Sequence, residues 1–399
     1  MTFATGIQNI IFSTELTVPV AVMAVTGAAL LVTYVLWQWC RTWRLERFVR
    51  HEEADRTYAE ELPPVSIIVD ACNETDQLNR FLPLVLGQDY PEFEVIAVVN
   101  GTAESTSGLL SEMKLEHPNL HITFAPYELR ALSRKKLALM IGIKAAKYDI
   151  VLTTCANCRA TSDQWLGTMM RNFTPDTDIV LGYSHYRYHR DTKRGRRHRV
   201  FDTVSTGVQW LQAAVKGRPY RGTSDNLAYR KRLFFEHQGF AKSMDLRWGE
   251  DDVFLSEIAQ GAVTRVEMAP ASQMHAYYED LPRAHRVLKE RREFTSRHVR
   301  RSPFVTQACM SFAWWLGHVV LVAAACMAWP NAAVAVAACV CLLLMWNFAS
   351  WALWRQCGVL EAPRLWFSVP WLALWRPLVN ARYRMAGSRN RKSNYTSYI

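Results

Sequence analysis

The chain has 399 residues, a formal net charge of +11 and a composition that is 50% hydrophobic. This length suits one large soluble domain with added membrane segments. Six of the nine cysteines lie in or beside apolar runs, a pattern unlike a secreted disulfide framework, and reduced thiols in a cytosol-facing protein are predicted. The positive charge gathers beside the apolar runs, at residues 41–50 and 376–392, which favours a membrane surface over nucleic acid as partner.

The first apolar run, residues 18–37, carries no charge. It is long enough to cross a bilayer, and we predict a transmembrane helix over residues 18–39. Basic residues follow this run and do not precede it, so a cleaved signal peptide is not expected. The positive-inside tendency places residues 1–17 outside and residues 40–62, a basic juxtamembrane segment and linker, in the cytoplasm.

An alternation of strands and helices begins at residue 63. Short runs typical of buried strands lie at residues 65–69, 95–99, 122–124 and 150–154. Residues 133–147 have the apolar spacing of a helix. The alternation predicts an α/β domain over residues 63–301 with a mainly parallel sheet. Ligands bind at the carboxyl ends of such strands, so the turns after Val69, Val99 and Thr154 are expected to converge on one site.

The chain returns to membrane character after this domain. Residues 304–354 contain no Asp, Glu, Lys or Arg, and Trp329-Pro330-Asn331 interrupts them. We predict two transmembrane helices, over residues 304–328 and 332–354, joined by a short external turn.

Two further segments are predicted to lie at the membrane surface. Residues 200–216 are amphipathic. Residues 362–380 are rich in tryptophan and contain Pro370 and Pro377, which favours an interfacial or re-entrant helix over a full span. Residues 381–399 form a basic tail.

Three consecutive acids, Glu250, Asp251 and Asp252, follow Gly249 and open an apolar-periodic run. This pattern indicates a helix N-terminus, where the helix dipole and the first N–H groups favour carboxylates. The same cluster at the mouth of a soluble domain also suits a general base or a metal ion. The pattern alone leaves a helix cap and a catalytic carboxylate both open.

Several short motifs follow one another along the chain: Pro64-Val65-Ser66-Ile67-Ile68-Val69, Asn73-Glu74, Gln88-Asp89-Tyr90-Pro91, Ser133-Arg134-Lys135-Lys136, Asn226-Leu227-Ala228-Tyr229-Arg230 and Gly249-Glu250-Asp251-Asp252. Together they resemble a family-2 membrane glycosyltransferase, closest to bacterial members with one span before the catalytic domain and two or three after it. The resemblance implies a GT-A fold, a nucleotide-sugar donor and inversion at the anomeric carbon. It also implies a lipid-linked or polysaccharide acceptor of the cell envelope, in the inner membrane.

The resemblance assigns roles to single residues. Asp251 stands at the place of the general base, with Glu250 and Asp252 shaping the acceptor side. Arg291 and Arg292 stand near the family's Gln-x-x-Arg motif, whose leading Gln is Lys or Leu here, and would hold the diphosphate. The other donor-binding residues implied by position are Asn73, Glu74, Asn100, Lys135 and Asn157. The acceptor-binding residues implied by position are Asp225, Asn226 and Trp248.

The departures from the family pattern fall on the donor site. The family ends its fourth strand with Asp-x-Asp, which holds a divalent metal, but this chain has Thr154-Cys155-Ala156-Asn157-Cys158 there. Gly101 likewise stands in place of an acid after the second strand. Mg²⁺ and Mn²⁺ prefer hard oxygen ligands, and Asn157 offers only a neutral carbonyl, so binding of either ion should be severely weakened.

Three explanations stay open. The enzyme works without a tightly held metal, using Lys135 and the two arginines of the donor site to neutralise the diphosphate. Alternatively, the chain is an inactive homologue that serves as a partner or scaffold. Or three thiols near the strand ends, Cys72, Cys155 and Cys158, supply a soft-metal or redox site in place of the acids.

Overall fold

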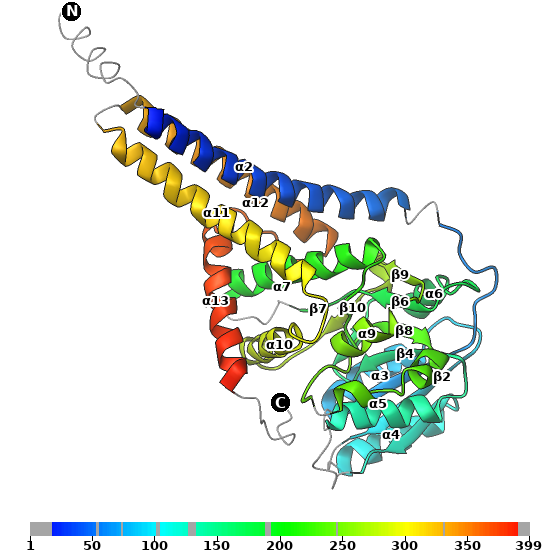
Figure 1. The fold of residues 1–399 in the computed structure, drawn as a ribbon. Helices are drawn as coiled ribbons and strands as arrows, with labels where there is room; N and C mark the ends of the chain where they lie inside the picture. Colours follow the sequence, from blue (N-terminus) through cyan, green and yellow to red (C-terminus); the bar gives the residue numbers. More distant parts are fainter. Residues whose placement is uncertain are drawn as a thin grey trace, which may run out of the picture. The chain divides into compact units, whose positions relative to one another are not determined.

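The computed structural model describes residues 18–52, 56–72, 75–100, 104–126, 133–187, 193–244, 246–329 and 332–389 (Figure 1). The chain divides into two compact units. The helical unit comprises Met1–Arg47, Gly195–Val208 and Ser302–Arg382, and the sheet unit comprises Phe48–Arg194, Gln209–Arg301 and Tyr383–Ile399. The domain limits expected from the sequence remain a prediction.

Seven strands of the sheet unit form one sheet in the order β3-β2-β1-β4-β8-β6-β9. They are β1 Val65–Ala71, β2 Phe93–Val99, β3 Leu120–Phe124, β4 Ile150–Cys155, β6 Ile179–Gly182, β8 Leu227–Arg230 and β9 Thr264–Glu267. Within this sheet β8 alone runs antiparallel to its neighbours, so the predicted mainly parallel α/β sheet is confirmed. Every residue of β1 is buried, and all but Ser66 and Asp70 are apolar, so its sequence does not alternate between apolar and polar residues.

The helices α3 (Thr75–Leu86), α4 (Glu104–Glu116) and α5 (Arg134–Ala145) connect the first four strands (Figure 1). The predicted helix over residues 133–147 is thereby confirmed as α5. A Cβ on Gly142 would lie 2.5 Å from Ile68 Cγ2, so glycine allows α5 to pack closely on β1. Because α5 follows β3 and leads back to the start of β4, its first turn lies at the carboxyl ends of the strands.

A smaller sheet of three strands was not predicted from the sequence. It has the order β5-β10-β7, with bounds β5 Cys158–Ala160, β7 Ser184–Tyr186 and β10 Met274–Ala276. Strands of three residues are too short to show a periodic pattern. The remaining helices of the sheet unit are α6 Trp165–Met170, α8 Lys231–Glu236, α9 Asp252–Ile258 and α10 Leu281–Thr295.

Three helices of the helical unit are long and apolar enough to cross a membrane: α2 (Val18–Arg47), α11 (Ser302–Met327) and α12 (Ala332–Val359). They pack side by side (Figure 1). Each coincides with an apolar run for which the sequence predicts a span. The predicted break at Pro330 and Asn331 lies outside the described residues.

Three helices end beyond their predicted limits. α12 ends at Val359, past the predicted limit at residue 354. α2 continues to Arg47, and a π-helical turn, Phe48–Glu52, follows it, so part of the predicted linker is helical. α13 (Val369–Arg389) begins later than the predicted surface helix and runs into the predicted basic tail. Helix α7 (Arg196–Val215) covers the amphipathic segment at residues 200–216. The position of both helices at a membrane surface stays a prediction.

Ion pairs join the helices of the helical unit near the polar ends of the apolar runs. Arg355 of α12 donates from Nε and Nη2 to the two carboxylate oxygens of Glu46 on α2, each at 2.6 Å. Arg376 of α13 donates from Nε to Asp202 Oδ1 of α7 at 2.9 Å. The bidentate Arg355–Glu46 pair fixes the two side chains in one geometry.

Two glycines permit a close approach of α2 and α11. A Cβ on Gly27 would lie 2.9 Å from the backbone nitrogen of Leu321, and a Cβ on Gly317 would lie 3.1 Å from the carbonyl oxygen of Gly27. Small residues at helix contacts let backbones approach in membranes, where packing and not hydrophobic burial drives association.

We expect Gly27→Ala to lower the Tm of the full chain in detergent, because a backbone atom must move to admit the methyl group. Overpacking of this kind costs about 1–3 kcal/mol. Gly108→Ala is the matched control, since Gly108 also lies in a helix and a Cβ there would meet nothing within 4 Å. Equal Tm values for the two variants would contradict the proposed helix contact.

Candidate functional site

The carboxyl ends of β1, β2 and β4 converge, as the sequence predicts. Asp70, near the end of β1, lies beside Val98 of β2 and Cys155 of β4 in the sheet register. Asn100 Nδ2, just after β2, donates to Asp70 Oδ1 at 3.2 Å. Burial raises the pKa of Asp70, and this outweighs the opposing effects of Lys135 and Asn100. Asp70, which the sequence did not single out, therefore lies at the converging strand ends, although it is not among the residues that line the cavity described below.

A hydrogen-bonded chain of side chains crosses the end of β4. Lys135 Nζ, from the first turn of α5, donates to Cys155 Sγ at 3.3 Å. The Cys155 thiol in turn donates to Asp225 Oδ1 at 3.3 Å. Asp225, which precedes β8, also accepts a hydrogen bond from Ser184 Oγ at 3.2 Å. Because β8 pairs with β4, Asp225 lies beside the segment where the family carries its metal-binding acids.

Asn157 is not arranged as a metal ligand. Its Nδ2 donates to the carbonyl oxygen of Tyr277 at 3.2 Å, and its Oδ1 accepts from Cys158 Sγ at 3.6 Å. Its assignment to donor or metal binding stays a prediction that these contacts do not favour.

The three thiols do not form a soft-metal site. Among the residues that the structure describes, which include Cys72, Cys155 and Cys158, no three His, Cys, Asp or Glu side chains are grouped to hold a metal ion. A hydrogen bond with Cys155 and burial together raise the pKa of Cys158 well above its ordinary value. A protonated thiol is a poor metal ligand, so these contacts do not favour the soft-metal alternative, and a redox role for the thiols stays a prediction.

The acid trio lies at the start of α9, as the sequence predicts. Gly249 has φ +119°, a conformation that favours glycine, and it leads directly into the acids. Asp251 is the N-cap, and its Oδ1 accepts from the backbone N–H of Asp252 at 2.8 Å. Glu250 Oε2 accepts from the backbone N–H of Gly249 at 3.0 Å. The helix cap and the candidate base are thus the same residue.

Arg291 of α10 joins the first two acids. Its Nη2 lies 2.5 Å from Asp251 Oδ2 and 3.0 Å from Glu250 Oε1. Burial alone would raise the pKa of Asp251, but Arg291 and Lys135 lower it by more, so its pKa lies below the ordinary value. Asp251 is therefore a carboxylate at neutral pH, the form that a general base requires.

Asp252 faces a different partner. Its Oδ2 accepts from Arg221 Nε at 3.0 Å and from Thr295 Oγ1 at 2.7 Å. Arg221 also donates from Nη2 to the carbonyl oxygen of Arg292 at 3.1 Å. These bonds fasten the start of α9 to α10, so Asp252 holds the acid loop in place.

Lys136 anchors the loop that leads to the acids. Its side chain is fully buried, and its ammonium donates to the carbonyl oxygens of Ser243, Leu246 (2.8 Å) and Trp248 (3.2 Å). Successive helix residues point about 100° apart. Lys135 and Lys136 therefore contact different parts of the protein, although they are neighbours in the sequence.

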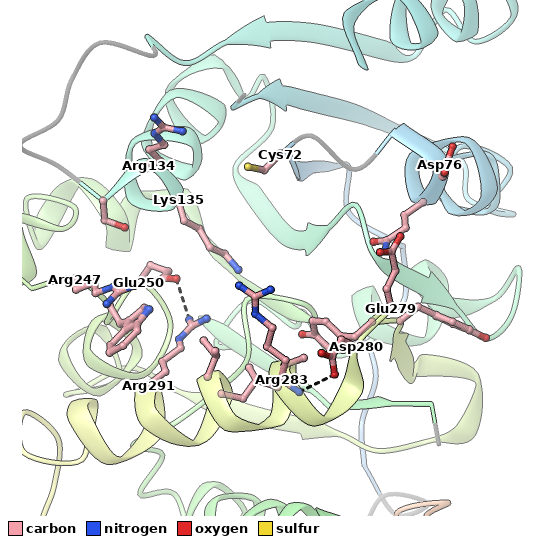
Figure 2. A pocket seen from close by; sticks show the side chains of 18 of the residues that line it. Cys72, Asp76, Arg134, Lys135, Arg247, Glu250, Glu279, Asp280, Arg283 and Arg291 are labelled. Carbon is pink, nitrogen blue, oxygen red and sulfur yellow. Dashed lines mark hydrogen bonds and ion pairs between the residues drawn. The ribbon is translucent and has the colours of Figure 1, made fainter. Parts of the chain in front are cut away.

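A cavity of about 850 Å³ lies at this end of the sheet unit. Figure 2 shows Lys135 of α5 and Arg283 and Arg291 of α10 projecting into it, with Glu250 held by Arg291. The described residues that line it are Cys72, Thr75, Asp76, Gln77, Ser133, Arg134, Lys135, Arg247, Trp248, Glu250, Tyr277, Tyr278, Glu279, Asp280, Arg283, Ala284, Val287, Leu288 and Arg291. Four of the site residues expected from the sequence line the cavity: Lys135, Trp248, Glu250 and Arg291.

Other expected site residues lie elsewhere. Asn226 is fully buried: its amide accepts from Trp165 Nε1 and donates to the carbonyl oxygens of Tyr183 and Ser272. Those hydrogen bonds give the Asn226 side chain a structural role. Neither Asp251 nor Arg292 is among the residues that line the cavity. Asn73 and Glu74 lie outside the described residues.

Sequence reasoning missed Arg283. It precedes Arg291 by about two helical turns, and Val287 lies between them, so the three share one face of α10. Helical spacing backwards from Arg291 was the signal that would have found it.

Glycosyl transferase family 21 matches residues 20–386. Poly-beta-1,6-N-acetyl-D-glucosamine synthase of Staphylococcus epidermidis is 31% identical over 88 residues, which cover 22% of this chain and 20% of that protein. Glycosyltransferase AglE of Haloferax volcanii is 23% identical over 146 residues, 36% of this chain and 46% of that protein. The matches thus span less than half the length of these curated relatives.

A solved structure has the same fold. Mannosyltransferase PcManGT from Pyrobaculum calidifontis, in complex with GDP-Man and Mn²⁺, has a TM-score of 0.54 and 18% identity, over 84% of this chain and 96% of that chain. This likeness establishes the GT-A fold. The family match extends over most of the sequence and confirms the family-2-like resemblance. The chain belongs to glycosyl transferase family 21.

Proposed function

We propose that the chain is an inverting glycosyltransferase that moves a sugar from a nucleotide-sugar donor to a lipid-linked or polysaccharide acceptor. The observation that carries the proposal is the ion-paired cluster of Glu250, Asp251 and Arg291. Glu250 and Arg291 line a cavity that Lys135 also lines, and Asp251 lies behind them. Sugar transfer needs a carboxylate to accept a proton and cations to stabilise a departing diphosphate. Both requirements are met within one site.

In this reaction Asp251 removes the proton of an acceptor hydroxyl. The hydroxyl oxygen then forms a bond to the anomeric carbon, and the bond from that carbon to the nucleoside diphosphate breaks on the opposite face. The proton stays on Asp251, and the electron pair leaves with the diphosphate. Lys135 and Arg291 stabilise the negative charge that develops there.

Arg291 also bears on the basicity of Asp251. In the structure Arg291 lines the cavity while it pairs with Asp251, which does not line it. A bound diphosphate would compete for the guanidinium. Loss of that ion pair would raise the pKa of Asp251 and expose it to the acceptor, so donor binding would prepare the base.

The acceptor class and location rest on broader features. Three helices suit membrane spans, and one relative is named as a polysaccharide synthase. The positive-inside tendency favours a protein of the bacterial inner membrane whose sheet unit lies in the cytoplasm. Three spans are few for a polymer channel, which favours addition of one sugar over processive export. Trp248, whose ring lies 5.4 Å from that of Phe294, lines the cavity and offers an aromatic face to an acceptor sugar.

The test is isothermal titration of the full chain in detergent with UDP and GDP, each with Mn²⁺ or with EDTA. We expect one of them to bind more tightly than its monophosphate, because the second phosphate adds charge for Lys135 and Arg291 to bind. Consumption of the matching nucleotide sugars is measured alongside.

Absence of binding by UDP, GDP and other nucleoside diphosphates, with no donor consumed, would contradict the proposal. The second candidate, an inactive partner of an active transferase, would then stand. The replacement of the Asp-x-Asp acids at the end of β4 is the observation that favours this second candidate.

A further inference from the structure

The end of β4 does not suit the divalent cation that the fold family implies. A hard cation such as Mn²⁺ or Mg²⁺ binds carboxylate oxygens, and two such groups are expected after the fourth strand. Here the two positions carry Cys155, whose thiol donates to Asp225, and Asn157, whose amide is bonded to Tyr277 and Cys158. Asp225 by itself does not make a metal site, and no metal-binding group is found among the described residues.

The positive charge of Lys135 already lies at the end of β4. Lys135 Nζ lies 3.3 Å from Cys155 Sγ, directly at the end of β4, and the side chain also lines the cavity. Burial and the neighbouring Arg291 disfavour its ammonium form, but Cys155, Glu250 and Asp225 outweigh them and raise the pKa of Lys135 well above its ordinary value. The side chain is therefore a cation at neutral pH. A divalent ion bound beside it would be repelled by this ammonium group.

The partner of Lys135 is what distinguishes it from a lysine in an ion pair. In the part of the chain that the structure describes, its ammonium donates to a sulfur and makes no ion pair with a carboxylate. Asp225 is reached through the Cys155 thiol and does not pair with Lys135 directly. An aspartate at residue 155 would stand beside the ammonium and neutralise it. Cysteine at this position keeps the lysine in place and leaves its charge to act on a ligand in the cavity.

We propose that the Lys135 ammonium takes the place of the divalent cation and binds the diphosphate of the donor, so that donor binding needs no metal. The proposal rests on the proposed function and specifies how the same site holds its donor. Under this proposal, Lys135 binds the donor. Cys155 is a positioning residue that acts through Lys135. Arg283 and Arg291 add positive charge on the opposite wall of the cavity (Figure 2).

The experiment measures the affinity of the full chain for UDP and GDP by isothermal titration, with EDTA and with Mn²⁺. For the nucleotide that binds, we expect the same affinity under both conditions. Lys135→Met should weaken this binding roughly 10-fold to 100-fold, the value of a lost charge-assisted hydrogen bond. Lys135→Arg, which keeps the charge, should retain most of it. Lys144→Met is the matched control, because Lys144 is exposed on the same helix.

Cys155→Asp gives a second and independent readout. We expect the new carboxylate to pair with Lys135 and to weaken metal-free binding, whereas Cys155→Ser should leave it near the wild-type value. A purely structural role for Cys155 predicts that Cys155→Asp changes the Tm without a selective loss of metal-free binding. Comparison of Tm values for all variants identifies any that fail to fold.

Three results would overturn the inference. Binding of the wild-type chain that appears only with Mn²⁺ would overturn it and leave the proposed glycosyl transfer intact. Unchanged affinity in a folded Lys135→Met variant would do the same. Absence of binding under every condition would overturn the proposed function together with this inference, so the two failures are distinguishable.

Discussion

Asp251→Asn is expected to reduce sugar transfer by about 100-fold or more, the usual contribution of a general base. The amide cannot accept the proton of the acceptor hydroxyl. It retains an oxygen that accepts from the N–H of Asp252, so the cap of α9 is preserved and the chain should fold. Turnover of the nucleotide sugar measures the first effect, and the Tm measures the second.

Nucleotide binding distinguishes a lost base from a damaged donor site. Asp251→Asn should bind the diphosphate at least as tightly as the wild type, because Arg291 loses one of its two acidic partners. Asp176→Asn, the same change at an exposed turn residue, is the control and should leave turnover unaltered. If Asp251→Asn keeps its activity while Glu250→Gln loses it, Glu250, which lines the cavity, is the base instead.

The pH profile gives a further test of the same residue. The pKa of Asp251 is lowered in the structure, so its carboxylate form is present above that value and is lost as the pH falls through it. If activity depended on donor affinity alone, protonation of Asp251 should cause no loss of activity at low pH. If bound donor draws Arg291 away, the acid limb of kcat should lie at higher pH than that of kcat/KM.

Lys136→Met should cause the second large effect, a loss of both stability and turnover. The substitution removes a buried ammonium and leaves the carbonyl oxygens of Ser243, Leu246 and Trp248 without that donor. Leaving buried acceptors unsatisfied costs about 2–4 kcal/mol in total. The loop that these carbonyls belong to leads into Glu250 and Asp251, so the acids should lose their fixed positions as well.

The measurements for Lys136→Met are the Tm in detergent and the turnover of the donor. Lys144→Met again serves as control, because it removes an exposed lysine from the same helix. A Tm and turnover equal to those of the control would show that Lys136 does not hold the acid loop. A lowered Tm with unchanged turnover would show that it stabilises the fold without positioning the acids.

Local sequence patterns were enough to predict the elements whose structure depends on residues close together in the sequence. The mainly apolar runs at 65–69 and 95–99 predict β1 and β2, since strands buried on both faces are mostly apolar. The acid trio after Gly249 predicts the N-cap of α9, because capping is an interaction between adjacent residues. Three long apolar helices follow in the same way from the length needed to cross a bilayer.

The direction in which each side chain points could be determined only from the tertiary structure. Arg291 and Arg292 look equivalent in the sequence, but neighbouring helix residues point about 100° apart, and the packing of α10 decides that Arg291 faces the cavity. In the same way Asp251 pairs with Arg291 while Asp252 pairs with Arg221, a residue far away in the sequence. Asn226, expected at the acceptor site, is committed to Trp165 and two backbone carbonyls.

The sequence by itself determined the family resemblance, the α/β alternation and the loss of the Asp-x-Asp acids, because each can be read within a few consecutive residues. Only the tertiary structure decided what stands at the end of β4. Lys135 comes from α5, Cys155 from β4 and Asp225 from the segment before β8, and the pairing of β8 with β4 brings them together. Contacts between segments so far apart in the chain are set by sheet order and helix packing, which no local pattern encodes.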